Sequence, residues 1–373
     1  MWFNLVVILL ILFLGFHFKH QYNLKCNTDI VRKRFIIIIS FVLVLQSGLR
    51  NMAVGTDTYN YFWIFNYVKT LSWSDIFETS LNHTQLSFWK DPGYMYFQKI
   101  IQYISGDFQV YLFIIAILFF SSLGYFLYKN TSRLTDLIIA FVIYEVLFYT
   151  FFSITGIRQT IATAATLYSF ELVKKRKLIP FIILILLAST IHISCLIFLP
   201  IYFVFYVKRP ALVYGIVLIL FPIFFMYRHF LMDFFRVFGG YEKYNKYASS
   251  GTLVFTTMFL LIAIAGLWRS KFILKHNPNS RYYFIALAIA VLFIPLTWVN
   301  PTAMRILLYF SIFMLLLIPE IIHSFNYSSI NVRRGVTVFV MIILLSLFIK
   351  SSWNAPPYGF FWETMPLPEV YLN

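Results

Sequence analysis

Apolar runs recur along the whole chain, and most are long enough to cross the roughly 30 Å hydrocarbon core of a bilayer. No interval between them is large enough for a soluble domain. Backbone polar groups in lipid must be satisfied within the membrane protein itself, so such runs fold as helices. With 61% hydrophobic and only 12% charged residues, the chain is predicted to be an all-α integral membrane protein with one polytopic domain over residues 1–373.

We expect about twelve transmembrane helices in one bundle. Their predicted spans are residues 2–16, 35–49, 108–128, 134–154, 156–173, 178–190, 192–207, 211–226, 252–268, 282–299, 305–322 and 334–351. Several spans are shorter than about 17 residues. The stretch 178–207 is therefore either two short helices or one helix with a re-entrant break.

Lysine and arginine placement orients the bundle, because short loops rich in these residues stay in the cytoplasm. Nineteen of the 30 basic residues lie in loops on one side, at residues 19–34, 129–133, 174–177, 208–209, 269–281 and 333–334. Both termini are therefore predicted outside the cytoplasm. The net charge of +16 follows from these loops, so no nucleic-acid partner is expected. The first apolar run lacks the features of a removable signal peptide and stays as a helix.

Two long segments fall on the outer side. Residues 50–107 are long for a structureless connection and should carry short or interfacial helices, and their Trp and Tyr content favours a place in the headgroup layer. Residues 227–251 contain the Gly239-Gly240 pair, which is typical of a hinge or tight turn. This second segment is either a mobile cover over a cavity or a solvated loop.

Three arginines, Arg50, Arg158 and Arg305, lie at outer helix ends, where the charge bias disfavours arginine. A guanidinium offers a rigid fork of donors that matches phosphate oxygens and stays charged. The three are therefore candidate anion ligands, with Arg228 and Arg236 in the second outer segment as further substrate contacts. The alternative is that each snorkels to the membrane surface.

The residues after Arg50, from 51 to 59, are rich in side chains that bind sugars or phosphates. The helix that follows would present amide donors to an anion. Asp57 in this segment is the best-placed general base. A helix cap beside a snorkelling arginine is the alternative. The candidate substrate-binding residues are Gly55, Thr56, Thr58 and Tyr59, with Gln159 next to Arg158. Tyr59, Tyr61, Trp63 and Trp89 are candidates for stacking on sugars or for interface anchoring.

His192 is the alternative base, although a lone histidine there is more often a packing residue. Its local sequence offers no His-Asp pair. Glu145, near the middle of the fourth predicted helix, faces a cavity or a partner. No Cys/His spacing or carboxylate pair indicates a metal, and no cofactor is expected.

Several short blocks occur in a fixed order. They are Arg50 with Val54-Gly55-Thr56-Asp57-Thr58 and Tyr61, then Asp91-Pro92-Gly93-Tyr94, Gly156-Ile157-Arg158-Gln159, His192 with Ser194, and Trp353 with Pro356-Pro357-Tyr358. Together they resemble the EpsG-like branch of the Wzy-type O-antigen and capsular polysaccharide polymerases, over most of the chain.

The resemblance implies an enzyme of the bacterial inner membrane with its active site facing the periplasm. Such an enzyme moves the growing glycan from one undecaprenyl pyrophosphate onto the non-reducing end of a second lipid-linked repeat unit. A chain-length regulator is a possible further partner. On this reading Arg158 and Arg305 bind pyrophosphate, Arg50 binds the same group or a nearby phosphate, and Asp57 or His192 takes the proton.

Three alternatives stay open. An O-antigen ligase uses the same lipid-linked donor and a similar architecture. A lipid-linked oligosaccharide flippase or exporter would need charge across the membrane, whereas the unusual polar residues gather on one face. Membrane acyl transfer would leave the outer arginines without a role.

Overall fold

The computed structural model describes residues 2–23, 28–55, 57–81, 91–239, 252–325, 328, 330–353 and 357–367. Within them the chain is mainly helical, with no β-strand. A helix, or a pair of short helical segments, occupies each of the twelve expected ranges. The prediction of an all-α polytopic membrane protein is confirmed.

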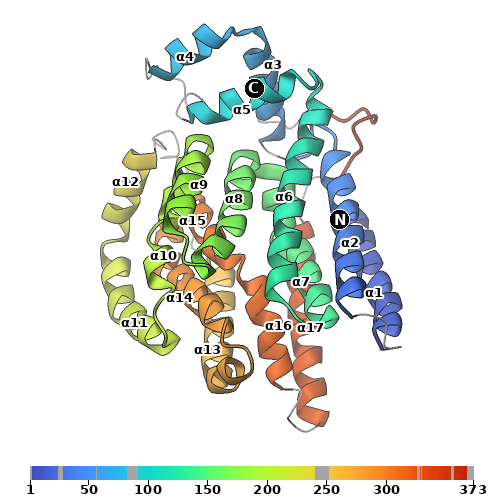
Figure 1. The fold of residues 1–373 in the computed structure, drawn as a ribbon, viewed down its shortest axis with the longest axis vertical. Helices are drawn as coiled ribbons and strands as arrows, with labels where there is room; N and C mark the ends of the chain where they lie inside the picture. The colour runs from blue at the N-terminus through green and yellow to red at the C-terminus, as the bar shows by residue number, and fades with distance from the viewer. Residues whose placement is uncertain are drawn as a thin grey trace. The chain divides into compact units, whose positions relative to one another are not determined.

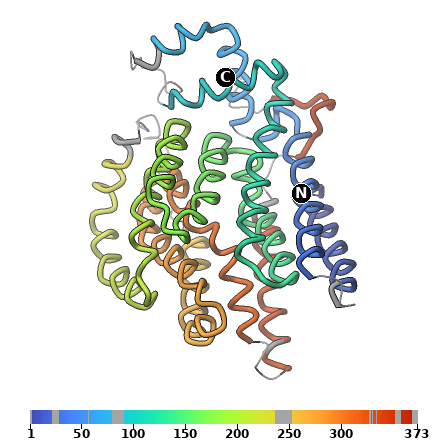
Figure 2. The backbone as a smooth tube through the Cα atoms, viewed as in Figure 1, coloured from blue at the N-terminus to red at the C-terminus, as the bar shows by residue number. Residues whose placement is uncertain are grey.

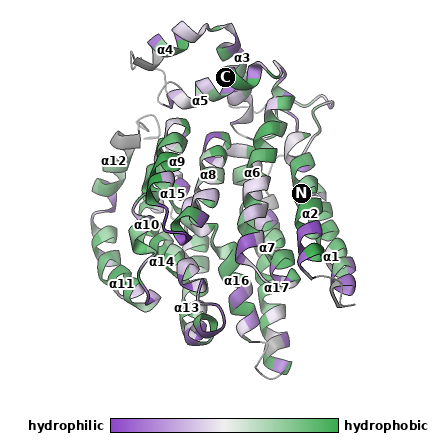
Figure 3. Ribbon diagram, in the orientation of Figure 1, coloured by the Kyte–Doolittle hydropathy of each residue, from purple (hydrophilic) through white to green (hydrophobic). Residues whose placement is uncertain are grey.

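Five described helices are long and apolar enough to cross a membrane, and the number rises to seven if each of two bent pairs forms one span. Residues 178–207 fold as separate short segments, α9 (Leu178–Ile191), η2 (Ile193–Phe198) and α10 (Ile201–Val204). Figure 3 shows hydrophobic colour along most helices and polar colour gathered toward helix ends.

The chain divides into two compact units. Unit 1 contains α1 (Trp2–Asn23), α2 (Thr28–Gly48), α6 (Phe108–Asn130), α7 (Leu134–Leu147), α8 (Ile157–Lys174) and nearly all of α9. Within this unit α2 packs along α6, α6 along α8, and α1 along α7 (Figure 1). The last two thirds of α17 (Ile330–Trp353), from Val338 on, also belong to unit 1.

The first outer segment carries the helices that we expected. They are α3 (Thr58–Thr70), α4 (Trp73–Leu81) and α5 (Pro92–Gln102), and they lie beyond the start of α6 (Figure 1). Their apolar faces share one core with the first turns of α6 and α8, built around Phe65, Tyr94 and Tyr111. Tyr61 is buried in this core, a position that does not suit stacking on a sugar.

A π-helical turn, η1 (Thr150–Thr155), separates α7 from α8. Such turns leave backbone carbonyls that need other donors within a membrane. Here the hydroxyl of Thr160 donates to the backbone carbonyl of Phe152, and the hydroxyl of Ser47 donates to the backbone carbonyl of Ser153. The irregular turn is thus held from two helices, and it sets where α8 begins.

Unit 2 is arranged around α14 (Ser280–Thr297), most of which is buried. Against it pack α11 (Pro210–Met226), α12 (Arg228–Gly239), α13 (Leu253–His276), α15 (Met304–Ser311) and α16 (Met314–Ser324). The chain bends by 85° between α11 and α12. The second outer segment therefore begins as a helix, and its residues 240–251 lie outside the described residues.

Candidate functional site

A carboxylate, a guanidinium and an imidazole meet in unit 1 at the ends of three helices. Asp91 precedes α5, Arg158 is the second residue of α8, and His192 follows α9. Nη1 of Arg158 lies 2.9 Å from Oδ2 of Asp91, and Nδ1 of His192 lies 3.6 Å from the same oxygen. Asp91 thus bridges the other two side chains. These three residues are hereafter the Asp91 cluster.

The members of the Asp91 cluster differ in exposure. The side chain of Asp91 is 0% exposed and that of His192 is 3% exposed, whereas that of Arg158 is 16% exposed. A buried carboxylate is stable as an anion only beside a cation or hydrogen-bond donors, and Arg158 provides the cation. The guanidinium is therefore the member that a ligand from solvent reaches most easily.

Local sequence explains how these helix ends come together. Pro92 occupies the first turn of α5, where its fixed φ favours helix initiation directly after Asp91. A Cβ atom on Gly93 would overlap the side chain and the carbonyl carbon of Thr190. Glycine at this position lets α5 approach the end of α9, which brings Asp91 beside His192.

Aromatic residues support Arg158 from the core of the outer segment. The ring centroid of Tyr94 lies 5.8 Å from Cζ of Arg158, within range of a cation–π interaction. The Tyr94 hydroxyl hydrogen-bonds the Tyr111 hydroxyl at 2.8 Å. Both tyrosines are buried, so packing fixes the Tyr94 ring that contacts the guanidinium.

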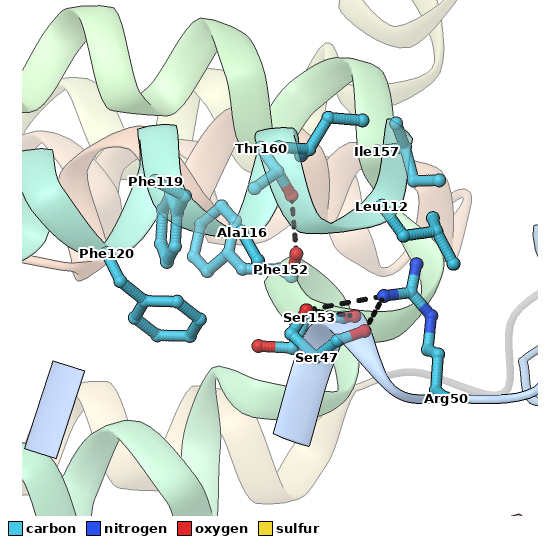
Figure 4. Close-up of a pocket in the computed structure, with 11 residues that line it drawn as sticks. Ser47, Arg50, Leu112, Ala116, Phe119, Phe120, Phe152, Ser153, Ile157 and Thr160 are labelled. Carbon is cyan, nitrogen blue, oxygen red and sulfur yellow. Dashed lines mark hydrogen bonds between the residues drawn. The ribbon is translucent and has the colours of Figure 1, made fainter. Parts of the chain in front are cut away.

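Arg50 occupies a different environment within unit 1. Its side chain is buried and turned to the interior (Figure 4). Nη1 donates to the backbone oxygen of Ser47 at 2.5 Å and lies 3.3 Å from the Ser47 hydroxyl. The cavity that Arg50 lines with Ser153 and Thr160 has a volume of about 10 Å³, which is space for about one water molecule and none for a phosphate.

Burial lowers the pKa of the Arg50 guanidinium from 12.5 to about 10, so the side chain stays charged near neutral pH. Its hydrogen bonds to Ser47 satisfy a carbonyl at the end of α2, where helices leave such groups without partners. In this arrangement Arg50 stabilises the end of α2. Contact with a pyrophosphate would require its side chain to turn outward.

Residues 357–367 cover this end of α2 (Figure 2). The backbone amide of Phe361 donates to the carbonyl of Leu49 at 2.9 Å, and the backbone amide of Asn51 donates to the carbonyl of Gly359 at 2.8 Å. The Tyr358 hydroxyl donates to the Gln46 carbonyl at 2.6 Å. Tyr358 belongs to the Pro-Tyr block near the end of the chain, to which we assigned no role, and it thus closes over Arg50.

The string after Arg50 folds as the expected tight turn. Gly55 has a φ of 96°, in the left-handed region that favours glycine, and a Cβ there would overlap Ile154. The buried Thr58 hydroxyl donates to the carbonyl of Val54 at 2.7 Å. This hydroxyl holds the turn, while Thr56 lies outside the described residues.

Asp57 takes the N-cap position of α3, but its side chain does not accept the capping hydrogen bond that the helix-cap alternative predicted. Tyr59 stacks on Phe62 with ring centroids 6.0 Å apart. Gln159, directly after Arg158, is buried.

The carboxylate that contacts Arg158 and His192 is that of Asp91, which we had not selected as a site residue. Its place before a proline at a helix start was the sequence signal for it.

Arg305 lies in unit 2, at the start of α15. It lines a cavity of about 290 Å³ whose other walls are mainly apolar, contributed by η2, α12 and the turn before α15. Ser194 and Thr302 add hydroxyl groups to the lining. One cation in an otherwise apolar cavity suits an amphiphilic anion with a hydrocarbon tail.

The remaining candidates are placed as follows. Arg228 begins α12, is half-buried, and donates to the carbonyl of Phe225 at 2.7 Å. The side chain of Arg236 and all of Trp89 lie outside the described residues. Arg50 and Arg158 belong to unit 1 and Arg305 to unit 2, so the convergence of the three arginines stays a prediction.

Two sequence-based interpretations need correction. His192 does have an aspartate beside it, although its local sequence offers none, because folding brings Asp91 to its imidazole. Glu145 lies near the end of α7 and not at mid-helix, because α7 ends at Leu147. There it accepts a hydrogen bond from Gln46 at 3.3 Å.

A family model described as the EpsG family matches residues 33–362, nearly the whole chain. The chain therefore belongs to the EpsG family, as the order of its sequence blocks predicted. Membership indicates a membrane glycosyltransferase of the polysaccharide-polymerase type. No curated protein and no solved structure matches the chain.

Proposed function

We propose that this member of the EpsG family is an O-antigen or surface-polysaccharide polymerase of the bacterial inner membrane. It transfers the growing glycan from one undecaprenyl pyrophosphate onto the non-reducing end of a lipid-linked repeat unit, at the periplasmic face. The observation that carries the proposal is the Asp91 cluster, which combines an anion ligand with a base and its orienting carboxylate.

Arg158 serves the leaving group in this reaction. The bond between the anomeric carbon and the pyrophosphate oxygen breaks, and its electron pair stays on the pyrophosphate. Negative charge on that oxygen grows toward the transition state, so a fixed guanidinium stabilises the transition state more than the ground state. Asp91 and Tyr94 hold Arg158 in place before the substrate binds.

His192 serves the acceptor. The attacking sugar hydroxyl forms the new bond to the anomeric carbon and must lose its proton. Nδ1 of His192 faces Asp91, which favours the tautomer that keeps its proton on Nδ1 and leaves Nε2 as the base. Asp57 is the alternative base, and the two are distinguished by substitution.

The cavity beside Arg305 supports a lipid-linked substrate. Its apolar walls match an isoprenoid chain and its guanidinium matches a pyrophosphate. We assign Arg305 to the pyrophosphate of the donor or the acceptor. Undecaprenyl pyrophosphate is released after each transfer, and no nucleotide sugar takes part.

Complementation of a deletion strain tests the proposal. Arg158→Ala and His192→Ala should abolish the ladder of long glycans while leaving the protein level and the single-repeat product intact. Arg158→Lys should restore polymer only in part, because an ammonium cannot reproduce the bidentate fork. Arg209→Ala, an exposed arginine before α11, is the matched control and should give wild-type ladders.

The same strains separate the rival activities. Loss of a ligase leaves no repeat unit on the final acceptor and glycan accumulates on the undecaprenyl carrier, whereas loss of a polymerase leaves single repeats attached. A flippase defect traps the repeat units on the cytoplasmic side. Full-length ladders from Arg158→Ala at normal protein level would overturn the assignment of Arg158.

A further inference from the structure

A long groove runs between α2 and α6 in unit 1, away from the Asp91 cluster. Its volume is about 480 Å³, and it follows the contact between these two neighbouring helices. The α2 side of the groove extends from Lys33 to Leu45, which is about 18 Å at the helical rise of 1.5 Å per residue. One leaflet of a bilayer core is about 15 Å thick, so the groove matches the length of one lipid chain.

The walls of the groove are mainly apolar and open to the outside of unit 1. Ile37, Phe41 and Ile117 line it and are 57%, 60% and 52% exposed. Gly124 forms part of the floor, where a Cβ atom would lie 3.0 Å from the side chain of Ile36. Glycine thus lets the two helices approach closely while the groove stays open above them.

One end of the groove is basic and aromatic. Lys33, Tyr125 and Tyr128 line it, and Nζ of Lys129 lies 5.8 Å from the ring centroids of both tyrosines. Asp29 is a nearby carboxylate, and it pairs with Arg32 and accepts a hydrogen bond from the Tyr128 hydroxyl. Lys33 and Lys129 therefore leave excess positive charge at this end.

A hydroxyl group lies part of the way along the groove. Oγ of Ser40 is buried and has no hydrogen-bond partner among the described residues. Ser40 is seven residues, about 10 Å, along α2 from Lys33. A lipid bound with its phosphate at Lys33 would bring its ester carbonyls in the direction of Ser40, where a carbonyl accepts from a hydroxyl.

We propose that this groove is a binding site for one anionic phospholipid of the surrounding membrane, with an acyl chain along α2 and α6 and the headgroup at Lys33 and Lys129. Basic residues at the bilayer surface recognise anionic headgroups in this way. The site is separate from the glycan chemistry, and the test below reads lipid retention alone, so its outcome does not depend on the proposed function.

The test uses full-length protein reconstituted in vesicles of equal phosphatidylglycerol and phosphatidylcholine, extracted gently and examined by native mass spectrometry. The wild-type protein should retain one phosphatidylglycerol in preference to phosphatidylcholine. Each of Lys33→Gln and Lys129→Gln should lower that preference about fivefold, since one basic residue contributes about that factor. Both lysines are exposed, so neither substitution should unfold the protein.

Two further variants locate the site. Ser121→Trp fills the middle of the groove and should abolish retention of the bound lipid. Lys175→Gln removes an exposed lysine at the end of α8 and should leave retention at the wild-type level. Equal retention of the two lipids by the wild-type protein, or an equal loss with Lys175→Gln, would overturn the proposal in favour of non-specific lipid contact.

Discussion

Replacement of Asp91 by Asn removes one negative charge from the Asp91 cluster and keeps the shape of the side chain. The amide can no longer attract the guanidinium of Arg158 at 2.9 Å or the imidazole of His192 at 3.6 Å. It also offers an NH₂ group where the neighbours need an acceptor. We therefore expect a folded protein in which the base and the pyrophosphate ligand are no longer held together.

The structure gives the size of this effect. At 2.9 Å the Coulomb attraction between unit charges is about 6 kcal/mol at an effective dielectric constant of about 20, and desolvation of the carboxylate offsets much of it. Removal of one partner of a buried pair costs about 3–5 kcal/mol. Because the Arg158 side chain is 16% exposed, solvent compensates part of that loss and we expect about 3 kcal/mol.

Activity should fall as well as stability. General-base catalysis contributes about 10²–10⁴-fold to a rate, and Asp91 acts on it through the orientation of His192. With lipid-linked repeat units as substrate, Asp91→Asn should lower kcat by at least 10²-fold, with a smaller change in KM. Thermal unfolding of the purified protein in detergent checks that the assay is run on folded enzyme.

Asp91→Glu and Asp75→Asn are the two comparisons. Glutamate keeps the charge and should recover part of the turnover. Asp75 is an exposed carboxylate of the same outer segment, and its replacement should leave turnover unchanged. A kcat for Asp91→Asn within threefold of the wild type would refute the role that we assign to the cluster.

Three further outcomes follow from the geometry. Gly93→Ala should reduce polymer strongly, because the new methyl group overlaps Thr190. Thr190→Gly in the same chain removes both overlapping side-chain atoms and should restore part of it; ladder length on glycan gels reports both. Arg305→Ala should abolish polymer at normal protein level, with partial rescue by Lys, and a normal ladder would exclude Arg305 from pyrophosphate binding. Asp57→Asn tests the alternative base: a severe fall in turnover at unchanged substrate retention would move the base from His192 to Asp57.

Local features of the chain were predictable. The apolar runs predicted the positions of the helices, since backbone groups in lipid need partners within the protein and a helix supplies them locally. The turn at Gly55 and the helix start after Asp91-Pro92 follow from glycine and proline geometry. Arg158 was identified because an arginine at an outer helix end departs from the charge bias.

Pairings between distant segments were beyond a reading of the sequence. Asp91 and Arg158 are 67 residues apart, and their contact depends on how α5 packs against α8 and α9. Arg50 looked like an exposed anion ligand, yet residues 357–367, more than 300 positions away, close over it. The residues next to Arg50 in the sequence do not predict that residues 357–367 cover it.

The sequence by itself determined the membrane class, the helix ranges and the family, because hydropathy and block order are properties of contiguous residues. Only the tertiary structure decided that Asp91 joins Arg158 to His192 and that Arg50 turns inward. The physical reason is that a buried charge is tolerated only where packing supplies a partner, and that partner comes from whichever helix end folding brings beside it.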